Sequence, residues 1–167
     1  MGFTDTDRAR AREIIARYPH AKSATLPLLH LAQDRDGWVT PGAMEEIAEL
    51  LGLTPAQVLG VCSFYTMFKR APVGRLVVSV CTNVSCLVNR GPELLAALEE
   101  RYGTDAEVFI EEAECLAACD RAPVVQVNYD YHGPLTPEQA GALIEEYRTG
   151  RRVARTISGS PVGGGES

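Results

Sequence analysis

The stretch RLVVSVCTNVSC, residues 75–86, joins a run of β-branched residues to two closely spaced cysteines. Residues 75–80 have the length and composition of a buried strand, so Cys81 is expected at the end of that strand. A second pair, Cys115 and Cys119, follows another predicted strand, residues 108–113. Two closely spaced cysteine pairs that are far apart in the chain indicate two loops that meet in the fold and enclose a common site.

The spacing of the pairs favours one kind of site and leaves others open. Structural zinc sites mostly use pairs with two intervening residues, and neither pair here has that spacing. A [2Fe–2S] cluster is wider than a single ion, so ligand loops with three or four intervening residues suit its two irons. Zinc and a metal-free site remain alternatives, whereas disulfides are disfavoured in a reducing compartment.

The predicted elements around the cysteines have the order β-α-β-β-α, a mixed sheet with helices on its faces. We expect this domain to span residues 73–157 and to have the size of thioredoxin. The expected elements are strands at 75–80, 108–113 and 123–127, helices at 91–103 and 136–150, a loop at 83–91, a turn at 129–133 and a disordered Gly/Ser-rich tail at 158–167.

Residues 1–72 are predicted to form a small bundle of four short helices. A first helix is expected at residues 4–18 and a second one between a Ser23 cap and Gly37. Two Thr-Pro pairs, Thr40-Pro41 and Thr54-Pro55, begin the other two, because threonine caps a helix and proline is tolerated at its first position. The fifth cysteine, Cys62, lies in the fourth helix beside apolar residues and is expected to be a buried core thiol.

Composition excludes several classes of function. The net charge of −6 argues against a nucleic-acid partner, which would require a basic face. No apolar run approaches the roughly 20 residues that span a bilayer, and the N-terminus lacks the apolar segment of a secretory signal. We therefore expect a cytoplasmic protein with no direct membrane insertion.

Five stretches together resemble a known family. CTNVSC, ECLAACDRAPVVQVN and LTPEQAGALIEEYRTG are similar to the 24 kDa-type iron–sulfur subunit of NADH:quinone oxidoreductase (respiratory complex I), as are LPLLHLAQDRDGW and VLGVCSFYTMF in the N-terminal half. The resemblance runs from about Tyr18 to Gly150. It implies an α/β chain in which an N-terminal helical domain precedes a thioredoxin-like domain with one [2Fe–2S] cluster. Its implied ligands, for both cofactor and metal, are Cys81, Cys86, Cys115 and Cys119.

The resemblance also implies a partner and an activity. A subunit of this kind passes single electrons between its cluster and the FMN of an NADH-binding flavoprotein subunit, so the chain alone is an electron carrier within an oxidoreductase. This chain has no GxGxxG motif after a strand, so NADH is expected on the partner. The complex would lie on the inner face of a bacterial cell membrane. The alternatives are the diaphorase subunit of an NAD-linked hydrogenase or formate dehydrogenase, and a non-redox zinc-bound interaction module.

Acidic residues around the second cysteine pair predict a low redox potential. Glu111, Glu112, Glu114 and Asp120 flank this pair and face one cation, Arg121. Reduction adds a negative charge to an already anionic centre, and nearby carboxylates oppose it. We expect a midpoint potential in the negative range of ferredoxins.

Three further local features carry expectations. Pro123, at the start of a strand, is expected to follow a cis peptide bond, as thioredoxin folds often have there. Ala117 stands where many relatives have glycine, so its methyl group is expected to shift a nearby amide. None of the three histidines, His20, His30 and His132, is placed as a ligand.

Overall fold

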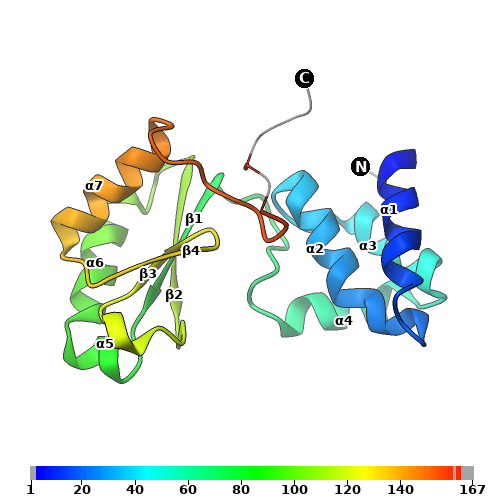
Figure 1. Ribbon diagram of the computed structural model, residues 1–167, viewed down its shortest axis with the longest axis horizontal. Coiled ribbons are helices and arrows are strands. Elements are labelled where there is room, and N and C mark those ends of the chain that lie inside the picture. The colour runs from blue at the N-terminus through cyan, green and yellow to red at the C-terminus, as the bar shows by residue number, and fades with distance from the viewer. Residues whose placement is uncertain (1–2, 160, 163–167) are drawn as a thin grey trace. The chain divides into compact units, whose positions relative to one another are not determined.

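The computed structural model describes residues 3–159 and 161–162, and the chain divides into two compact units, residues 1–72 and 73–167 (Figure 1). Among its described residues, the first unit contains helices and no strand. It contains α1 (Asp5–Ile15), the short 3₁₀ turn η1 (Ala21–Ala24), α2 (Thr25–Asp36), α3 (Pro41–Leu51) and α4 (Pro55–Phe64).

Local capping explains where most of these helices begin and end. The Thr40 hydroxyl accepts a hydrogen bond from the Ala43 N–H, and Thr54 forms a reciprocal capping box with Gln57, as the two Thr-Pro pairs predict. Gly37 ends α2 in the left-handed conformation, with φ of 76°. The prediction was wrong at Ser23, which lies inside η1 and caps nothing, and the first helix ends at Ile15 instead of residue 18.

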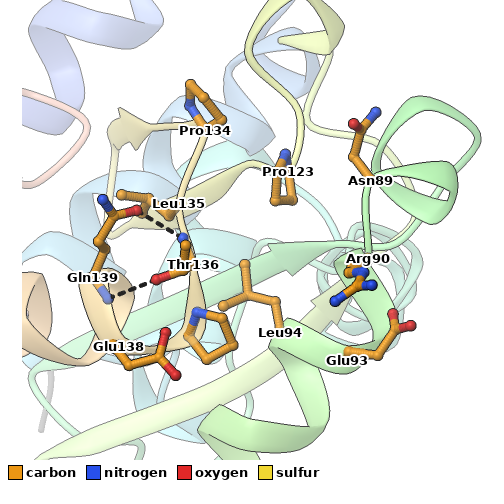
Figure 2. A pocket seen from close by; sticks show the side chains of 11 residues that line it. Asn89, Arg90, Glu93, Leu94, Pro123, Pro134, Leu135, Thr136, Glu138 and Gln139 are labelled. Carbon is orange, nitrogen blue, oxygen red and sulfur yellow. Dashed lines mark hydrogen bonds between the residues drawn. The ribbon is translucent and has the colours of Figure 1, made fainter.

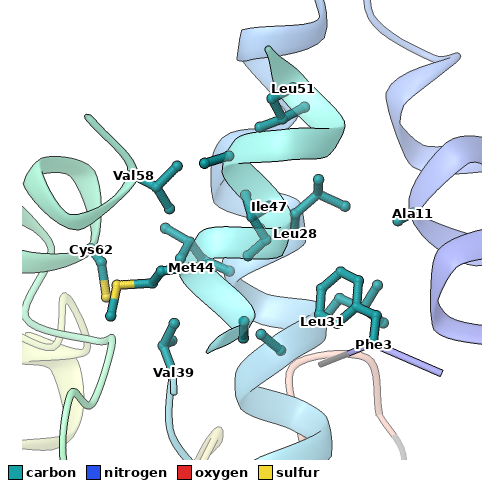
Figure 3. Packing of buried hydrophobic residues seen from close by; sticks show 14 of the residues in the cluster. Phe3, Ala11, Leu28, Leu31, Val39, Met44, Ile47, Leu51, Val58 and Cys62 are labelled. Atoms are coloured by element: carbon teal, nitrogen blue, oxygen red, sulfur yellow. The ribbon is translucent and has the colours of Figure 1, made fainter. Parts of the chain in front are cut away.

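The helices of the first unit pack around one apolar core (Figure 3). Leu28 of α2, Ile47 of α3 and Val58 of α4 are completely buried there. Cys62 is 1% exposed and faces Met44, so its predicted place in the core is confirmed. Burial raises the pKa of the Cys62 thiol, which therefore behaves as a small apolar side chain.

Asp7 links α1 to α2 and makes the unit sensitive to acid. Its burial raises the carboxyl pKa, but hydrogen bonds from Thr4 and from Arg35 (3.1 Å) outweigh burial and lower it below the ordinary value. Because the folded-state pKa lies below the unfolded one, this stabilisation is present above the unfolded pKa and is lost as the pH falls through the folded pKa. We expect Asp7→Asn to lower the free energy of unfolding by about 0.5–1 kcal/mol near pH 7 and by almost nothing near about pH 2. Urea unfolding at both pH values measures this, and an equal loss at both would contradict it.

The second unit is a four-stranded sheet with helices on one face (Figure 1). The strand order is β2-β1-β3-β4, with β1 and β2 parallel and the other pairings antiparallel. The elements are β1 (Leu76–Cys81), α5 (Ser85–Val88), α6 (Gly91–Tyr102), β2 (Val108–Ala113), η2 (Cys119–Arg121), β3 (Val125–Val127), β4 (Asp130–His132) and α7 (Pro137–Arg148). Apolar residues of β1, β2, β3, α6 and α7 share one core. The predicted α/β class is therefore correct.

Two predictions in this unit were wrong. The range 129–133, predicted as a turn, contains β4, which pairs with β3 as a tight hairpin around Asn128. Asn128 has φ of 52°, the left-handed conformation that asparagine tolerates in such turns. The range 83–91, predicted as a loop, contains the one-turn helix α5. Elements of three or four residues are too short to show a period in the sequence.

Part of the predicted disordered tail, 158–167, lies outside the described residues. Ser158 and Gly159 belong to a turn, and a single bridge joins Arg155 to Pro161. Among the described residues, no single helix is long and apolar enough to cross a membrane. Only α3 and α4 taken together pass that test, and they are bent by 116° at their junction.

Candidate cluster site

Three strands bring the cysteine loops to one edge of the sheet. Cys81 is the last residue of β1 and pairs in register with Ala113, the last residue of β2, so Cys115 follows just beyond the same edge. β3 runs antiparallel to β1 and therefore starts at this edge, and Cys119 lies in η2 shortly before it. Loops at the carboxyl ends of parallel strands are the usual place for a site on such a sheet.

The first pair of cysteines forms the buried side of the site. Cys81 and Cys86 are 3% and 1% exposed and share a small apolar cluster with Val124. Burial, followed by the hydrogen bond with the Cys81 thiol, raises the pKa of Cys86 to about 11. The nearby Val124 backbone opposes that rise, because it favours the thiolate.

The second pair forms the exposed side. Cys115 and Cys119 are both exposed, and the Cys115 Sγ accepts a hydrogen bond from the Ala117 N–H at 3.4 Å. Cys119 is close enough to Cys86 to interact with it electrostatically. Within residues 3–159 and 161–162, no three His, Cys, Asp or Glu side chains are grouped as a metal site. The structure thus places Cys81 and Cys86 in one cluster, with Cys119 near Cys86. The Cys115 sulfur is hydrogen-bonded within its own loop.

The donor set fits an iron–sulfur cluster. Thiolates are soft ligands that suit iron–sulfur clusters, and four of them are the usual complement of a [2Fe–2S] centre. The backbone N–H of Ala117 already donates a hydrogen bond to the Cys115 sulfur, and such hydrogen bonds stabilise anionic sulfur. No histidine belongs to this apolar cluster or to either cysteine pair.

Glycine is required where α6 meets the first cysteine loop. A Cβ added at Gly91 would lie 2.6 Å from the Cys81 carbonyl oxygen and 3.0 Å from that of Cys86. These are backbone atoms that cannot rotate away. The start of α6 therefore contacts the backbone that carries the buried cysteine pair. The sequence did not predict this contact, because Gly91 had only the pattern of a helix start.

Ala117 is held in an unfavourable conformation in the second loop. Its φ of 55° lies in the left-handed region, which costs an alanine about 1 kcal/mol or more relative to glycine. We expect Ala117→Gly to raise the free energy of unfolding of the apo chain by about 0.5–1 kcal/mol, after allowing for the extra freedom that glycine gives the unfolded chain. Thermal unfolding measures the change.

Ala118→Gly is the matched control for that prediction. Ala118 has an ordinary φ of −118° and packs against the apolar cluster of the first pair. At this position glycine only adds conformational freedom to the unfolded chain and removes the contact made by the methyl group. The free energy of unfolding should therefore fall. A lower free energy of unfolding in both variants would contradict the strain at Ala117.

Most of the acidic residues near the second cysteine pair form a hydrogen bond or an ion pair. Glu111 accepts a hydrogen bond from the Ser79 hydroxyl at 2.8 Å, and Glu112 accepts one from the Thr82 hydroxyl at 2.6 Å. Asp120 faces the guanidinium of Arg121 at 3.7 Å. Glu111 and Glu112 lie on β2, the strand that leads into the second cysteine loop, and the low potential stays a prediction.

A pocket of about 670 Å³ lies beside the site, between the beginnings of α6 and α7 (Figure 2). Pro123 and Pro134 line it, and each follows a cis peptide bond. The cis bond before Pro123 is confirmed, and the one before Pro134 was not predicted. The other lining residues are Asn89, Arg90, Glu93, Leu94, Leu135, Thr136, Pro137, Glu138 and Gln139.

Comparisons with known proteins agree with this geometry. The E-type subunit of NADH-quinone oxidoreductase from Mycobacterium tuberculosis is 44% identical over 161 residues, which cover 92% of this chain and 64% of that relative. The chain thus spans less than two thirds of the length of this mycobacterial protein. NADH-quinone oxidoreductase subunit 2 of Thermus thermophilus is 36% identical over 92% of this chain and 90% of that protein.

Solved structures share the fold at lower identity. The NAD⁺-reducing [NiFe]-hydrogenase in its air-oxidized state superimposes with a TM-score of 0.66 at 22% identity, covering 77% of this chain and 23% of that one. Residues 11–148 match the family described as thioredoxin-like [2Fe-2S] ferredoxin. Since that match includes both cysteine loops and most of the helical unit, the chain belongs to the thioredoxin-like [2Fe–2S] ferredoxin family.

Proposed function

We propose that this chain is the iron–sulfur electron-transfer subunit of a complex I-type NADH dehydrogenase. It holds one [2Fe–2S] cluster on Cys81, Cys86, Cys115 and Cys119, and it exchanges single electrons with the flavin of a partner subunit. When bound, such a cluster takes up or releases one electron at a time. The chain's own residues supply the four thiolates, an N–H donor to sulfur and the carboxylates that set the charge around the site.

The observation that carries this proposal is the meeting of both cysteine loops at one edge of the sheet. Parallel β1 and β2 end there and antiparallel β3 begins there, so residues 81–86 and 115–119 face a common place. Membership of a [2Fe–2S] ferredoxin family over residues 11–148 favours a cluster over zinc. On the same grounds, the zinc-bound interaction module is not the preferred function.

Exposed apolar side chains support a role inside a larger complex. Phe64 at the end of α4 is 77% exposed, and Val84 and Val88 on the first cysteine loop are 72% and 77% exposed. Exposed apolar groups of this kind often mark surfaces that other proteins cover. We infer that the helical unit docks on the NADH-binding flavoprotein subunit, which would carry both FMN and NADH, and that the complex lies at the cytoplasmic face of the membrane.

The hydrogenase alternative rests on one structural likeness. At 22% identity, that likeness to an NAD⁺-reducing hydrogenase supports the fold alone. Two relatives at 36% and 44% identity are both NADH-quinone oxidoreductase subunits. They favour the complex I type.

An anaerobic spectrum with metal analysis tests the proposal. The purified chain should hold two irons, absorb visible light, bleach with dithionite and then give a one-electron paramagnetic signal, because a [2Fe–2S] centre is reduced by one electron. A colourless chain with one zinc, even after reconstitution with iron and sulfide, would overturn it. Co-purification of a flavoprotein with the tagged chain from its native host tests the partner separately.

A further inference from the structure

The fourth helix of the first unit, α4, carries apolar side chains on its outer side as well as on its packed side. It has no charged residue, and its buried side chains, Val58 and Cys62, face the core of the unit (Figure 3). On the outer side, Leu59 is 43% exposed and Phe64 is 77% exposed. A helix that is apolar on all sides is normally buried on all sides. The outer side of α4 therefore has the composition of a surface that another molecule covers.

The segment after α4 extends this apolar surface. Tyr65 and Met67 are both exposed, and the ring of Tyr65 meets that of Phe64 edge to face, with centroids 5.0 Å apart. We call Phe64, Tyr65 and Met67 the α4 patch. Single exposed apolar residues are ordinary on a protein surface, but three large ones within four residues mark a place that other molecules cover.

Hydrogen bonds hold the backbone of this segment in one conformation. The side chain of Gln33, from α2, donates to the Met67 carbonyl at 2.9 Å and accepts from the Lys69 N–H at 2.7 Å. The Lys69 carbonyl in turn accepts from the Val39 N–H at 2.7 Å. Between these bonds, the side chain of Phe68 is buried in the core of the unit. The patch therefore has a fixed backbone, and a partner that covers it loses little conformational entropy in ordering it.

The chain segment that carries the patch is basic, although the whole chain has a net charge of −6. No aspartate or glutamate occurs between Glu49 and Glu93, and two cations, Lys69 and Arg70, follow the patch within three residues. Arg70 is exposed. A complementary surface would therefore have apolar side chains at its centre and carboxylates at its rim.

These features distinguish the possible occupants of the patch. A second copy of this chain, bound through the same patch, would place its own cations opposite these cations, and like charges across an interface are unfavourable. A helix that lies on a membrane surface carries lysine or arginine on its polar side, and α4 has neither. A protein partner with carboxylates around an apolar surface meets neither objection.

We propose that the α4 patch, with Arg70 at its rim, is the docking surface for the NADH-binding flavoprotein subunit, and that the facing surface of that subunit is apolar with carboxylates at its border. This inference rests on the proposed function, which supplies the partner. Aromatic residues, methionine and arginine are enriched in such interfaces, and a few of them usually provide most of the binding energy. Phe64 is the most exposed residue of the patch and should contribute most.

Phe64→Ala, compared with Tyr18→Ala, tests the proposal. Tyr18 is another aromatic residue of the same unit, 39% exposed, and it follows α1. The purified full-length chain is titrated by calorimetry with the purified flavoprotein subunit of the same host. Phe64→Ala should raise the dissociation constant at least about thirtyfold, the effect of losing an interface hot spot, and Tyr18→Ala less than about threefold. Both variants should keep the iron content of the wild-type chain, since neither residue belongs to the unit that carries the cysteine pairs.

Arg70→Glu, compared with Arg17→Glu, tests the charge at the rim of the patch. Both arginines are exposed, and both variants change the net charge equally, so a difference between them reports the position of the charge. Arg70→Glu should slow association about tenfold at low salt and remove most of its salt dependence, because salt screens the attraction of complementary charges. Arg17→Glu should keep nearly the wild-type rate. Stopped-flow fluorescence at several salt concentrations measures both.

Equal effects of Phe64→Ala and Tyr18→Ala, or faster association of Arg70→Glu, would overturn the docking surface. A wild-type dimer that Phe64→Ala dissociates in sedimentation would also overturn it, as would wild-type binding to phosphatidylserine vesicles that the same change abolishes. A wild-type chain that binds the flavoprotein subunit but holds no iron after reconstitution would instead overturn the proposed electron transfer. The titration of Phe64→Ala would still decide the docking surface in that case.

Discussion

Replacing Cys119 with alanine should abolish the cluster and leave the apo fold intact. Cys119 is exposed in η2 and lies outside the buried apolar clusters, so its removal should change the free energy of unfolding by no more than about 0.5 kcal/mol. Its thiolate is one of the four that we propose as cluster ligands, and alanine offers no substitute ligand. We expect the iron content to fall from two per chain to nearly none, together with the visible absorption.

Cys62→Ala is the matched control, because it removes the one cysteine outside the site. Cys62 is buried in the core of the helical unit, so this variant should lose stability, by about 1 kcal/mol, through the cavity it leaves. It should nevertheless keep both irons. The two variants therefore separate ligand loss from unfolding: one loses iron without losing stability, and the other loses stability without losing iron. Full iron in Cys119→Ala would contradict the assigned ligands.

Sequence could predict the features that depend on local chemistry. The β-branched run before Cys81 and the two Thr-Pro helix starts each depend on neighbouring residues, and the structure confirms both. Cys62 was predicted to be buried for the same reason, because apolar residues surround it in its own helix. The four cysteines remain predicted ligands, supported by their meeting at one edge of the sheet.

Features that depend on contacts between distant segments were not predictable in this way. β4 is three residues long and exists because β3 pairs with it. The close approach of Gly91 to Cys81 and Cys86, and that of Gly133 to residues 121–124, involve backbone atoms that carry no sequence signal. Sequence showed His132 only as a residue that is not a ligand. Its bond to Tyr147 becomes visible once β4 and α7 are placed together.

Gly91→Ala should have the other large effect, because it adds one methyl group where the backbone leaves no room. The new Cβ would lie 2.6 Å from the Cys81 carbonyl oxygen and 3.1 Å from the Cys86 carbonyl carbon. Relief requires moving either α6 or the loop that carries the buried pair, and such overpacking costs about 1–3 kcal/mol. We expect the second unit to unfold at lower denaturant, and the chain to hold much less than two irons because the Cys81 and Cys86 sulfurs shift.

Gly60→Ala adds the same methyl group where it meets nothing within 4 Å. Gly60 lies inside α4, and alanine in a helix interior is favoured over glycine by about 0.5–1 kcal/mol, so this control should stabilise the helical unit. Circular dichroism during denaturant unfolding measures stability, and an iron assay measures loading. If Gly91→Ala kept full iron and unchanged stability, the first cysteine loop would be free to move, and the site could not owe its geometry to the start of α6. If Gly91→Ala lost iron with stability unchanged, the first cysteine loop would have moved and displaced its sulfurs. Gly91 would then determine the geometry of the site without contributing to stability.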